Sequence, residues 1–321
     1  MTTRLLSGDP MTRRAIAVAS ACLLALALPA GRPDRALAGV EATCPAPRHD
    51  PRSAGHEGRG HGPHHHHPDA EEVGRMEDDF KRRFSALRMA PPTTVTVPLW
   101  VHVLSDGQNR ASDQAVRKQV ETLNAAYSGR YGGTDTGMRF RLMGVVVTVN
   151  ADWFRDPLGH ETQMKGTLRK GGVGTLNLYL AQLSELVLGY STYPFWLRGN
   201  PRADGVVIDW RTLPGGAMQD FNRGFTGVHE IGHWLGLLHT FENGCEEPGD
   251  HVDDTPPQAR PTQGCPTFVD SCPGGGADPI HNFMDYSNDV CMSEFTAGQG
   301  KRMREIWATY RAENRDITLN G

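Results

Sequence analysis

The chain has 321 residues, enough for one large domain or two small ones. Its formal net charge is −4, and 22% of its residues are charged. A balance this close to neutral offers no basic surface for nucleic acid or for an anionic membrane, so neither is expected as a partner.

The first 38 residues predict an export signal. Arg13 and Arg14 form a basic segment, and residues 15–30 form an apolar run that is too short to be a comfortable transmembrane helix. The Ala-Leu-Ala sequence at 36–38 offers a cleavage site. We therefore expect a signal peptide over residues 1–38, a secreted, extracellular protein and no membrane span.

Residues 39–91 do not have the composition of a folded domain, because they are rich in Pro, Gly, Arg and His. We interpret the His-rich tract around 64–67 as a solvated linker, although polyhistidine also binds metals weakly. Phe80, Phe84 and Leu87 have helical spacing, which predicts a short helix at the end of this segment. We expect a largely disordered pro-segment over residues 39–91.

Residues 92–321 predict the folded domain. Runs of β-rich residues with alternating apolar positions predict strands at 95–104, 138–149, 176–181, 189–192 and 205–209. Apolar residues at helical spacing predict helices at 112–127, 162–170, 221–237 and 296–311. Ser112 is the expected N-cap of the first of these helices.

The sequence HEIGHWLGLLH at 229–239 is the most informative part of the chain. His229 and His233 are four residues apart, so both lie on one face of a helix and can reach one metal ion. Gly236 allows the chain to leave the helix, which brings His239 round as a third ligand. Three neutral imidazoles with one open position describe a catalytic zinc site and not a closed structural one.

Two further features complete this pattern. Glu230 follows the first histidine and is placed to act as a general base beside the metal. A zinc helix of this type predicts a methionine turn downstream, and NFMDY at 282–286 fits it. Met284 would form the apolar floor beneath the metal, although a lone methionine is usually ordinary core filling.

The chain resembles the pappalysin family of metzincin metalloproteases, peptidase family M43. The matching segments are HEIGHWLGLLHTF at 229–241, GDHVDDTP at 249–256, NFMDYSNDVC at 282–291 and FTAGQGKRM at 295–303. The resemblance implies a zinc-dependent endopeptidase that cleaves extended proteins or peptides. It implies that His229, His233 and His239 bind zinc, that Glu230 is the general base and that Tyr286 stabilises the oxyanion.

The resemblance also implies the fold. We expect an α+β, metzincin-like protease with a twisted mixed five-stranded sheet, backing helices and a zinc helix. An irregular, disulfide-rich C-terminal subdomain should form the lower jaw. Residues 188–192 are the candidate edge strand that pairs with substrate through backbone hydrogen bonds. His102 and His160 are expected to be ordinary strand and loop residues.

Four cysteines cluster in the zinc-site half, and they allow three disulfide connectivities. A second metal site is the alternative, but the spacing lacks C-x-x-C pairs. The resemblance implies the bonds Cys245–Cys272 and Cys265–Cys291. Cys22 lies in the predicted signal peptide, which leaves Cys44 as the odd thiol. Cys44 could keep the precursor latent by binding zinc, or it could be incidental or form an intermolecular disulfide.

Two secondary sites are expected. Residues 242–254 hold six acids and no Lys or Arg, which suits structural calcium unless the loop is merely solvated. By resemblance, Asp250 and Thr255 match calcium ligands. Asp289 lies where some relatives place a carboxylate at the base of the S1′ pocket, which would favour Arg or Lys at P1′. A surface loop position is the alternative for Asp289.

The sequence therefore predicts a secreted zinc metalloendopeptidase made as a latent zymogen. One alternative is a catalytically inactive secreted module that binds zinc or protein with the same fold. Another is a metal-sequestering protein based on the His-rich tract. The sequence carries no signal for an oligomeric state.

Overall fold

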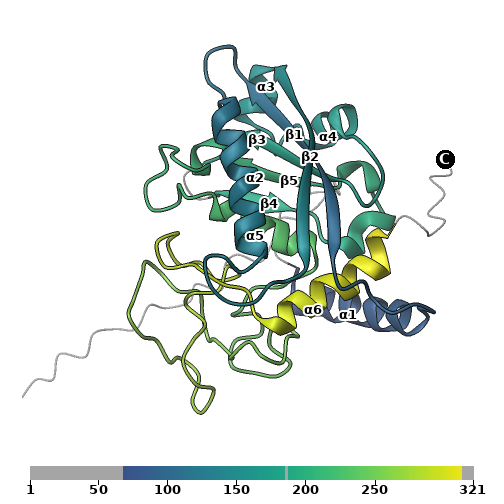
Figure 1. Ribbon diagram of the computed structural model, residues 1–321, viewed down its shortest axis with the longest axis vertical. Helices are drawn as coiled ribbons and strands as arrows, with labels where there is room; N and C mark the ends of the chain where they lie inside the picture. The colour runs from purple at the N-terminus through teal and green to yellow at the C-terminus, as the bar shows by residue number, and fades with distance from the viewer. Residues whose placement is uncertain (1–67, 185–186, 313–321) are drawn as a thin grey trace, which may run out of the picture. The chain divides into compact units, whose positions relative to one another are not determined.

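The computed structural model describes residues 68–184 and 187–312 of the chain (Figure 1). The predicted signal peptide, the His-rich tract at 64–67 and Cys44 lie outside the described residues. None of the described helices is long and apolar enough to cross a membrane.

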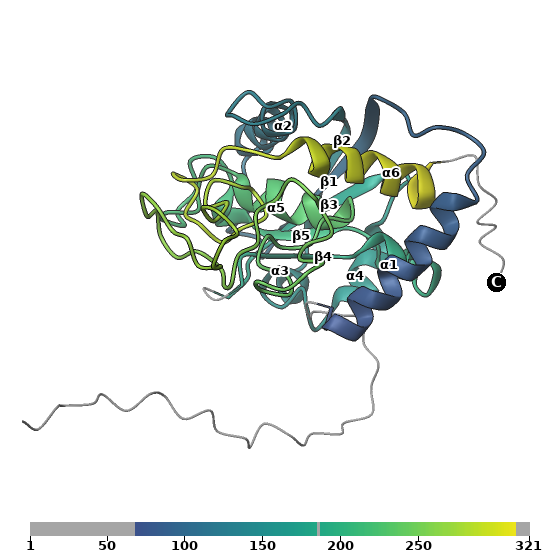
Figure 2. The same cartoon turned by 90° about the horizontal axis from the view of Figure 1, so that it is seen from below.

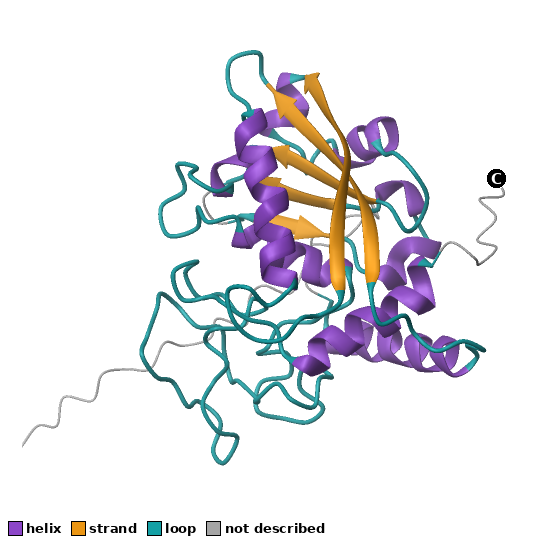
Figure 3. Cartoon of the chain, in the orientation of Figure 1, coloured by secondary structure: helices purple, strands orange, loops and turns teal. Residues whose placement is uncertain are grey.

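The domain is built on a five-stranded sheet with the strand order β2-β1-β3-β5-β4 (Figure 3). The strands are β1 (Val95–Ser105), β2 (Met138–Val149), β3 (Leu176–Ala181), β4 (Gly189–Ser191) and β5 (Val206–Asp209). All neighbouring strands are parallel except β4, which pairs antiparallel with β5. The predicted mixed sheet is confirmed, and β4 lies at one of its edges.

One face of the sheet carries the main hydrophobic core, between the strands and the helices α2 (Asp113–Tyr127) and α5 (Phe225–Trp234). Leu99, Leu123 and Val228 are fully buried in this core. The Ser112 hydroxyl caps α2 by accepting a hydrogen bond from the backbone N–H of Ala115. The core therefore fixes α5, the helix with the histidine motif, against the sheet.

The opposite face is covered by α3 (Ala151–Arg155) and α4 (Glu161–Leu168). Trp153 and Phe154 of α3 and Met164 of α4 pack on it. The short helix α3 was not predicted from the sequence. It forms because the Asn150 side chain accepts hydrogen bonds from the backbone N–H groups of Asp152 and Trp153.

The region between α5 and α6 (Ala297–Ile306) is a set of loops below the sheet (Figures 1 and 3). The disulfides Cys245–Cys272 and Cys265–Cys291 cross-link these loops, so two closed rings overlap in sequence. A segment with so little regular structure gains much of its order from such bonds, because they restrict the unfolded chain. The expected disulfide-rich C-terminal region is confirmed. A π-helical turn, η4 (Trp307–Arg311), continues α6.

A long helix precedes the sheet. Helix α1 (Ala70–Ser85) is capped by Asp69, whose carboxylate accepts a hydrogen bond from the backbone N–H of Glu72 at 2.8 Å. It lies beside α6, as both Figure 1 and Figure 2 show. Its buried residues are Val73, Met76, Glu77 and Phe80. Three 3₁₀ turns lie before α5, namely η1 (Pro194–Arg198), η2 (Pro201–Ala203) and η3 (Trp210–Thr212).

Candidate metal centre and active site

Helix α5 is shorter than the sequence predicted, because a glycine in the left-handed conformation bounds each end. Gly224 has φ 86° and starts the helix, where residues 221–224 were expected to be helical. Gly236 has φ 94°, so the chain turns away after Trp234. A Cβ at Gly236 would also lie 2.8 Å from Ile306 of α6, so the turn needs glycine for space as well.

His229 and His233 of α5 and His239 after the turn bring their side chains to one point. The Nε2 atoms lie 3.1 Å apart for His229 and His233, 3.0 Å for His233 and His239, and 3.1 Å for His229 and His239. All three residues are buried. A triangle of this size fits three nitrogens around one ion with bonds of about 2.0–2.1 Å.

The backbone fixes which nitrogen faces this point in His229 and His233. The Nδ1 atom of His229 lies 2.7 Å from the Phe283 carbonyl oxygen, and that of His233 lies 2.8 Å from the Leu237 carbonyl oxygen. A carbonyl only accepts, so Nδ1 carries the proton and Nε2 carries a lone pair. Unprotonated nitrogens this close repel each other, and a shared cation offsets the repulsion. The donor set therefore fits zinc.

The methionine turn lies against the middle of α5. Met284 is fully buried, and its Sδ atom occupies the space where a side chain at Gly232 would be. Thr240, which follows the third histidine, donates its backbone N–H to the Met284 carbonyl oxygen at 3.3 Å. Met284 thus packs as a buried apolar residue against α5, between the positions of His229 and His233.

Glu230 lies beside the histidines under the edge strand. It is buried, and burial raises its pKa to about 8, although a hydrogen bond from the Ser191 side chain opposes this shift. A Cβ at Gly189 would lie 2.7 Å from Cγ of Glu230, so glycine allows β4 to approach the carboxyl group closely. A carboxyl group with a pKa near neutrality suits reversible proton transfer.

Tyr286 forms a wall of the site. Its ring centroid lies 4.7 Å from that of His239 and 5.7 Å from that of His229. Burial raises the pKa of its hydroxyl above the ordinary value, so the group stays protonated and can donate a hydrogen bond.

These residues line a cleft of about 740 Å³. The cleft extends along β4, where Leu188, Gly189, Tyr190 and Ser191 form one side. The cleft lining also includes Met218, Phe221, Phe225, Asp289 and Met292. A cleft lined largely by apolar side chains, with a few polar and ionisable groups among them, has the character of a ligand-binding site.

Asp289 is buried in the lining of the cleft. Its Oδ2 atom accepts the backbone N–H of Arg223 at 2.7 Å, and its carboxylate also accepts the backbone N–H of Phe225. Burial raises its pKa to about 6, although the two N–H groups oppose the shift. The carboxylate is therefore part of the cleft lining and not a group on an exposed loop.

The acidic loop brings only one of its six acids into the interior. Asp250 is 4% exposed, and burial raises its pKa to about 7. The Thr255 hydroxyl lies close to the Asp250 carboxylate and opposes this rise in its pKa. Neither Asp250 Oδ2 nor Thr255 Oγ1, however, makes a hydrogen bond of good geometry. Two buried oxygens without such a bond are a feature that a bound cation would explain.

The other histidines that we considered lie away from this site. His102 is buried in β1, where its Nε2 atom lies 2.9 Å from Asn177 Oδ1 and burial lowers its pKa to about 4. His160 precedes α4, with Nδ1 2.9 Å from the Asp156 carbonyl oxygen. Among the described residues, the only group of metal-binding side chains close enough to share an ion is His229, His233 and His239.

One residue of the site was not predicted. Tyr193 is 3% exposed and lines the cleft, and its hydroxyl oxygen lies 2.9 Å from Nδ1 of His233. It precedes Pro194 in a segment without helical or strand periodicity. No pattern in the sequence marks it, because its contact with His233 spans 40 residues.

The fold and the site together define a metzincin-type metalloprotease. A mixed sheet lies above a helix, three histidines converge beside a glutamate, and a methionine turn lies below them. The model of peptidase family M43, described as pregnancy-associated plasma protein-A, matches residues 213–308. An extracellular metalloprotease of Arthroderma benhamiae is 42% identical over 248 residues, which cover 74% of this chain and 81% of that protein. One of Pyricularia oryzae is 44% identical over 230 residues, covering 70% and 78%.

Two solved structures from Tannerella forsythia are also similar. A promirolysin mutant has a TM-score of 0.63 and 26% identity, covering 74% of this chain and 87% of that one. Mature mirolysin in complex with a cleaved peptide has a TM-score of 0.57 and 26% identity, covering 69% and 97%. This chain belongs to the pappalysin metalloproteases, peptidase family M43, and is a metalloendopeptidase. Membership of this family implies zinc as the metal.

Proposed function

We propose that this protein is a secreted zinc endopeptidase, exported by the signal peptide at residues 1–38 and made as a latent precursor. The observation that carries the proposal is the triangle of His229, His233 and His239 beside the buried carboxyl group of Glu230. Secretion is supported by the names of the relatives, which are extracellular metalloproteases. Because Glu230 is present beside the three histidines, an active enzyme is favoured over an inactive binding module.

The residues of the cleft divide the chemistry between them. Zinc held by the three histidines would polarise the carbonyl group of the scissile bond. Glu230 accepts a proton from the attacking water and passes it to the leaving nitrogen. Tyr286 donates a hydrogen bond to the oxyanion, where its stabilisation matters most.

Substrates are extended segments of proteins or peptides. In the part of the chain that the structure describes, β4 is an edge strand that pairs with β5, and an extended substrate chain can add to the outer side of an edge strand. This side borders the cleft, and Gly189 brings it close to Glu230. Pairing with β4 would give the bound peptide a single chain direction as it passes the histidines. Mature mirolysin, a structural neighbour, was solved with a cleaved peptide.

The preferred residue at P1′ is Arg or Lys. Asp289 lines the cleft together with Phe225 and Met292, so a cationic side chain can lay its stem along these two apolar residues and place its charge near the carboxylate. Arg is favoured over Lys, because its guanidinium group can bind a carboxylate in a bidentate manner.

Calcium stabilises the acidic loop. Asp250 Oδ2 and Thr255 Oγ1 are buried oxygens of the kind that calcium binds, and nearby backbone carbonyls would complete the shell. A bound cation would also keep Asp250 ionised, in spite of the burial that raises its pKa.

Latency involves the segment before the catalytic domain. Cys44 would block the zinc site as a fourth ligand until the segment is removed. Mirolysin, one structural relative, is known in a pro-form, promirolysin, and in a mature form. If a Cys44→Ser precursor were as latent as the natural one, this role of Cys44 would be wrong.

The test of the proposed function is a digest of a peptide mixture by the purified, processed enzyme. We expect one zinc per chain, cleavage that stops with 1,10-phenanthroline and returns with added zinc, and Arg or Lys enriched at P1′. Cleavage without basic preference would remove the specificity claim alone. No cleavage by a zinc-loaded protein would favour the inactive module.

A further inference from the structure

We propose that helix α1 is a permanent part of the metal centre, so that maturation leaves it attached and cuts the chain before Asp69. In this role α1 helps to hold His233 and His239 in position through the residues that pack between the helix and these histidines. The sequence placed the start of the folded domain at residue 92, after this helix. The inference rests on the proposed zinc function of the three histidines.

The helix is anchored to the domain by two apolar clusters. Val73 and Met76 pack with Tyr193 and Leu238. One turn further on, Phe80 packs with Leu197, Ile306 and Tyr310. All of these side chains are at most 9% exposed. Removal of α1 would therefore expose apolar surface on η1, on α6 and on the segment that leads to His239.

One chain of contacts runs from α1 to His233. The Glu72 carboxylate accepts a hydrogen bond from the indole N–H of Trp196 at 2.8 Å. The Trp196 ring meets the Tyr193 ring edge to face, with centroids 5.1 Å apart. The Tyr193 hydroxyl oxygen lies 2.9 Å from Nδ1 of His233. Contacts at the outer nitrogen of a metal-binding histidine fix its ring orientation, so Tyr193 is a positioning residue.

A second chain of contacts runs from α1 to the turn before His239. Glu77 and Arg302 form a buried ion pair, and the Arg302 Nε–H donates to the Gly236 carbonyl oxygen at 3.0 Å. Leu238, the neighbour of His239, packs on Val73 and Met76. The turn that delivers the third histidine is thus held by α1 through both a charge and an apolar contact.

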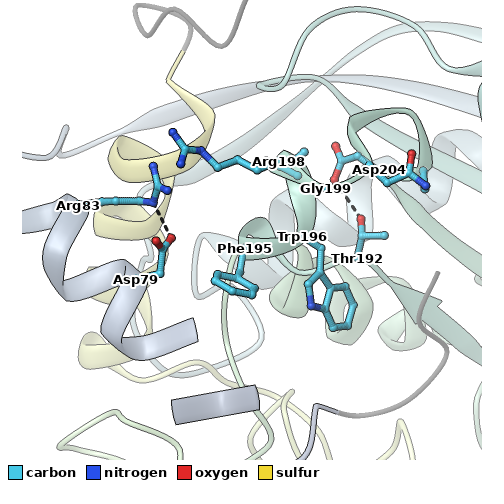
Figure 4. A pocket seen from close by; sticks show the side chains of 11 residues that line it. Asp79, Arg83, Thr192, Phe195, Trp196, Arg198, Gly199 and Asp204 are labelled. Carbon is cyan, nitrogen blue, oxygen red and sulfur yellow. Dashed lines mark hydrogen bonds and ion pairs between the residues drawn. The ribbon is translucent and has the colours of Figure 1, made fainter. Parts of the chain in front are cut away.

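The position of α1 is that of a support and not of an inhibitor. Among the described residues that line the cleft, none belongs to α1. The helix instead borders a separate cavity of about 600 Å³, which is lined by Asp79 and Arg83 of α1 and by Phe195, Trp196 and Arg198 of η1 (Figure 4). A helix docked away from the cleft does not need to leave for substrate to enter.

The helix also shields two arginines that the proposed P1′ preference would make cleavage sites in an extended chain. A protease with an edge strand binds extended chain. Arg82 and Arg83 lie within α1, and Arg83 is paired with Asp79 at 2.5 Å. Asp79 in turn accepts a hydrogen bond from the Tyr310 hydroxyl at 2.9 Å. Cleavage at either arginine would require this docked turn to unwind.

The test compares zinc release from four forms of the mature enzyme: wild type, Glu72→Ala, Tyr193→Phe and the double variant. Zinc is transferred to a chromogenic chelator and the rate is recorded. We expect each single variant to release zinc about tenfold faster. Because both act through one chain of contacts, the double variant should match Tyr193→Phe and not multiply the two effects. Glu71→Ala is the control, since Glu71 is exposed and forms its ion pair with Arg75 on the same helix.

Two further measurements separate the outcomes. Thermal unfolding of the metal-free variants should match that of the metal-free wild type, which distinguishes a positioning role from a general loss of packing. The intact mass of the processed protein should include residues 70–85.

Unchanged zinc release in Tyr193→Phe, or multiplied effects in the double variant, would overturn the positioning role. A mature chain that begins after Ser85 and keeps wild-type zinc affinity would overturn the permanent attachment of α1. A wild type without zinc would instead refute the proposed function.

Discussion

Met284 lies directly against Gly232, the glycine between the two histidines of α5. A Cβ at position 232 would occupy the space of the Met284 Sδ atom. The metal-binding helix and the methionine turn therefore meet at a point where no side chain fits on the helix. This close approach joins two segments that are about 50 residues apart in the sequence, and it places the floor of the metal site.

Replacing Gly232 with alanine should destabilise the protein by about 1–3 kcal/mol, because an added methyl group in a packed core forces its neighbours to move. Thermal or denaturant unfolding measures this change. Gly166→Ala in α4 is the matched control, since nothing lies within 4 Å of the added atom. That variant should be as stable as the wild type or more stable. If the two variants had the same free energy of unfolding, Met284 would be able to move aside for the added methyl group without loss of stability.

Asp289→Asn should remove the preference for Arg at P1′. The loss of an ionic hydrogen bond costs about 1.5–3 kcal/mol, so kcat/KM for a P1′ Arg peptide should fall about ten- to hundredfold while a P1′ Leu peptide is unaffected. Asp270→Asn, a change at an exposed loop residue, is the control. A P1′ profile unchanged by Asp289→Asn would show that the carboxylate does not read the substrate.

The same preference should depend on pH. Burial raises the pKa of Asp289 to about 6, so the carboxyl group is neutral below this pH and charged above it. The ratio of kcat/KM for P1′ Arg over P1′ Leu should therefore rise as the pH increases through about 6. Asp289→Asn should show no such rise. The ratio cancels the pH effects that Glu230 imposes on both peptides equally.

Calcium should raise the unfolding temperature of the zinc-loaded protein. A ligand at a hundred times its Kd stabilises the folded state by about 2.7 kcal/mol. Asp250→Asn should abolish the shift, whereas Asp253→Asn, at an exposed acid of the same loop, should leave most of it in place. Equal calcium shifts in the wild type and Asp250→Asn would mean that the ion binds elsewhere or only to the loop surface.

Glu77→Ala should destabilise the fold by about 3–5 kcal/mol, because it leaves the Arg302 charge buried without its partner. Asp78→Ala, an exposed neighbour on α1, is the control. Burial raises the pKa of Glu77, but the Arg302 guanidinium more than offsets this, and the net pKa lies below the ordinary 4.5. The stability from this pair is therefore present above pH 4.5 and is lost as the pH falls through the lower folded-state value. An acid unfolding curve unchanged by Glu77→Ala would contradict this.

The local features of the fold could be predicted from the sequence. The bounds of β2 and β3 and the Ser112 cap of α2 were all predicted, because strand alternation and capping are signals within a few residues. The convergence of the three histidines was predicted because a helix and a glycine turn fix their spacing. The length of α5 was wrong at both ends, since Gly224 and Gly236 acquire their positive φ values from packing that the motif does not reveal.

The long-range contacts could not be predicted. The sequence indicated a short helix from Phe80, Phe84 and Leu87, but Val73, Met76 and Glu77 contact residues more than 100 positions away. Tyr193 lies in a loop and a 3₁₀ turn, where no periodicity identifies a buried side. Both features depend on how distant segments pack around the histidines.

The most direct test of the account is the Glu230→Ala variant, measured for both zinc content and peptide hydrolysis. The carboxyl group transfers protons and does not hold the metal, so the variant should keep one zinc per chain. Its kcat should fall by about 10²–10⁴-fold, the usual contribution of a general acid–base group. A variant that hydrolyses peptides at a rate close to that of the wild type, while holding the same zinc, would contradict the account.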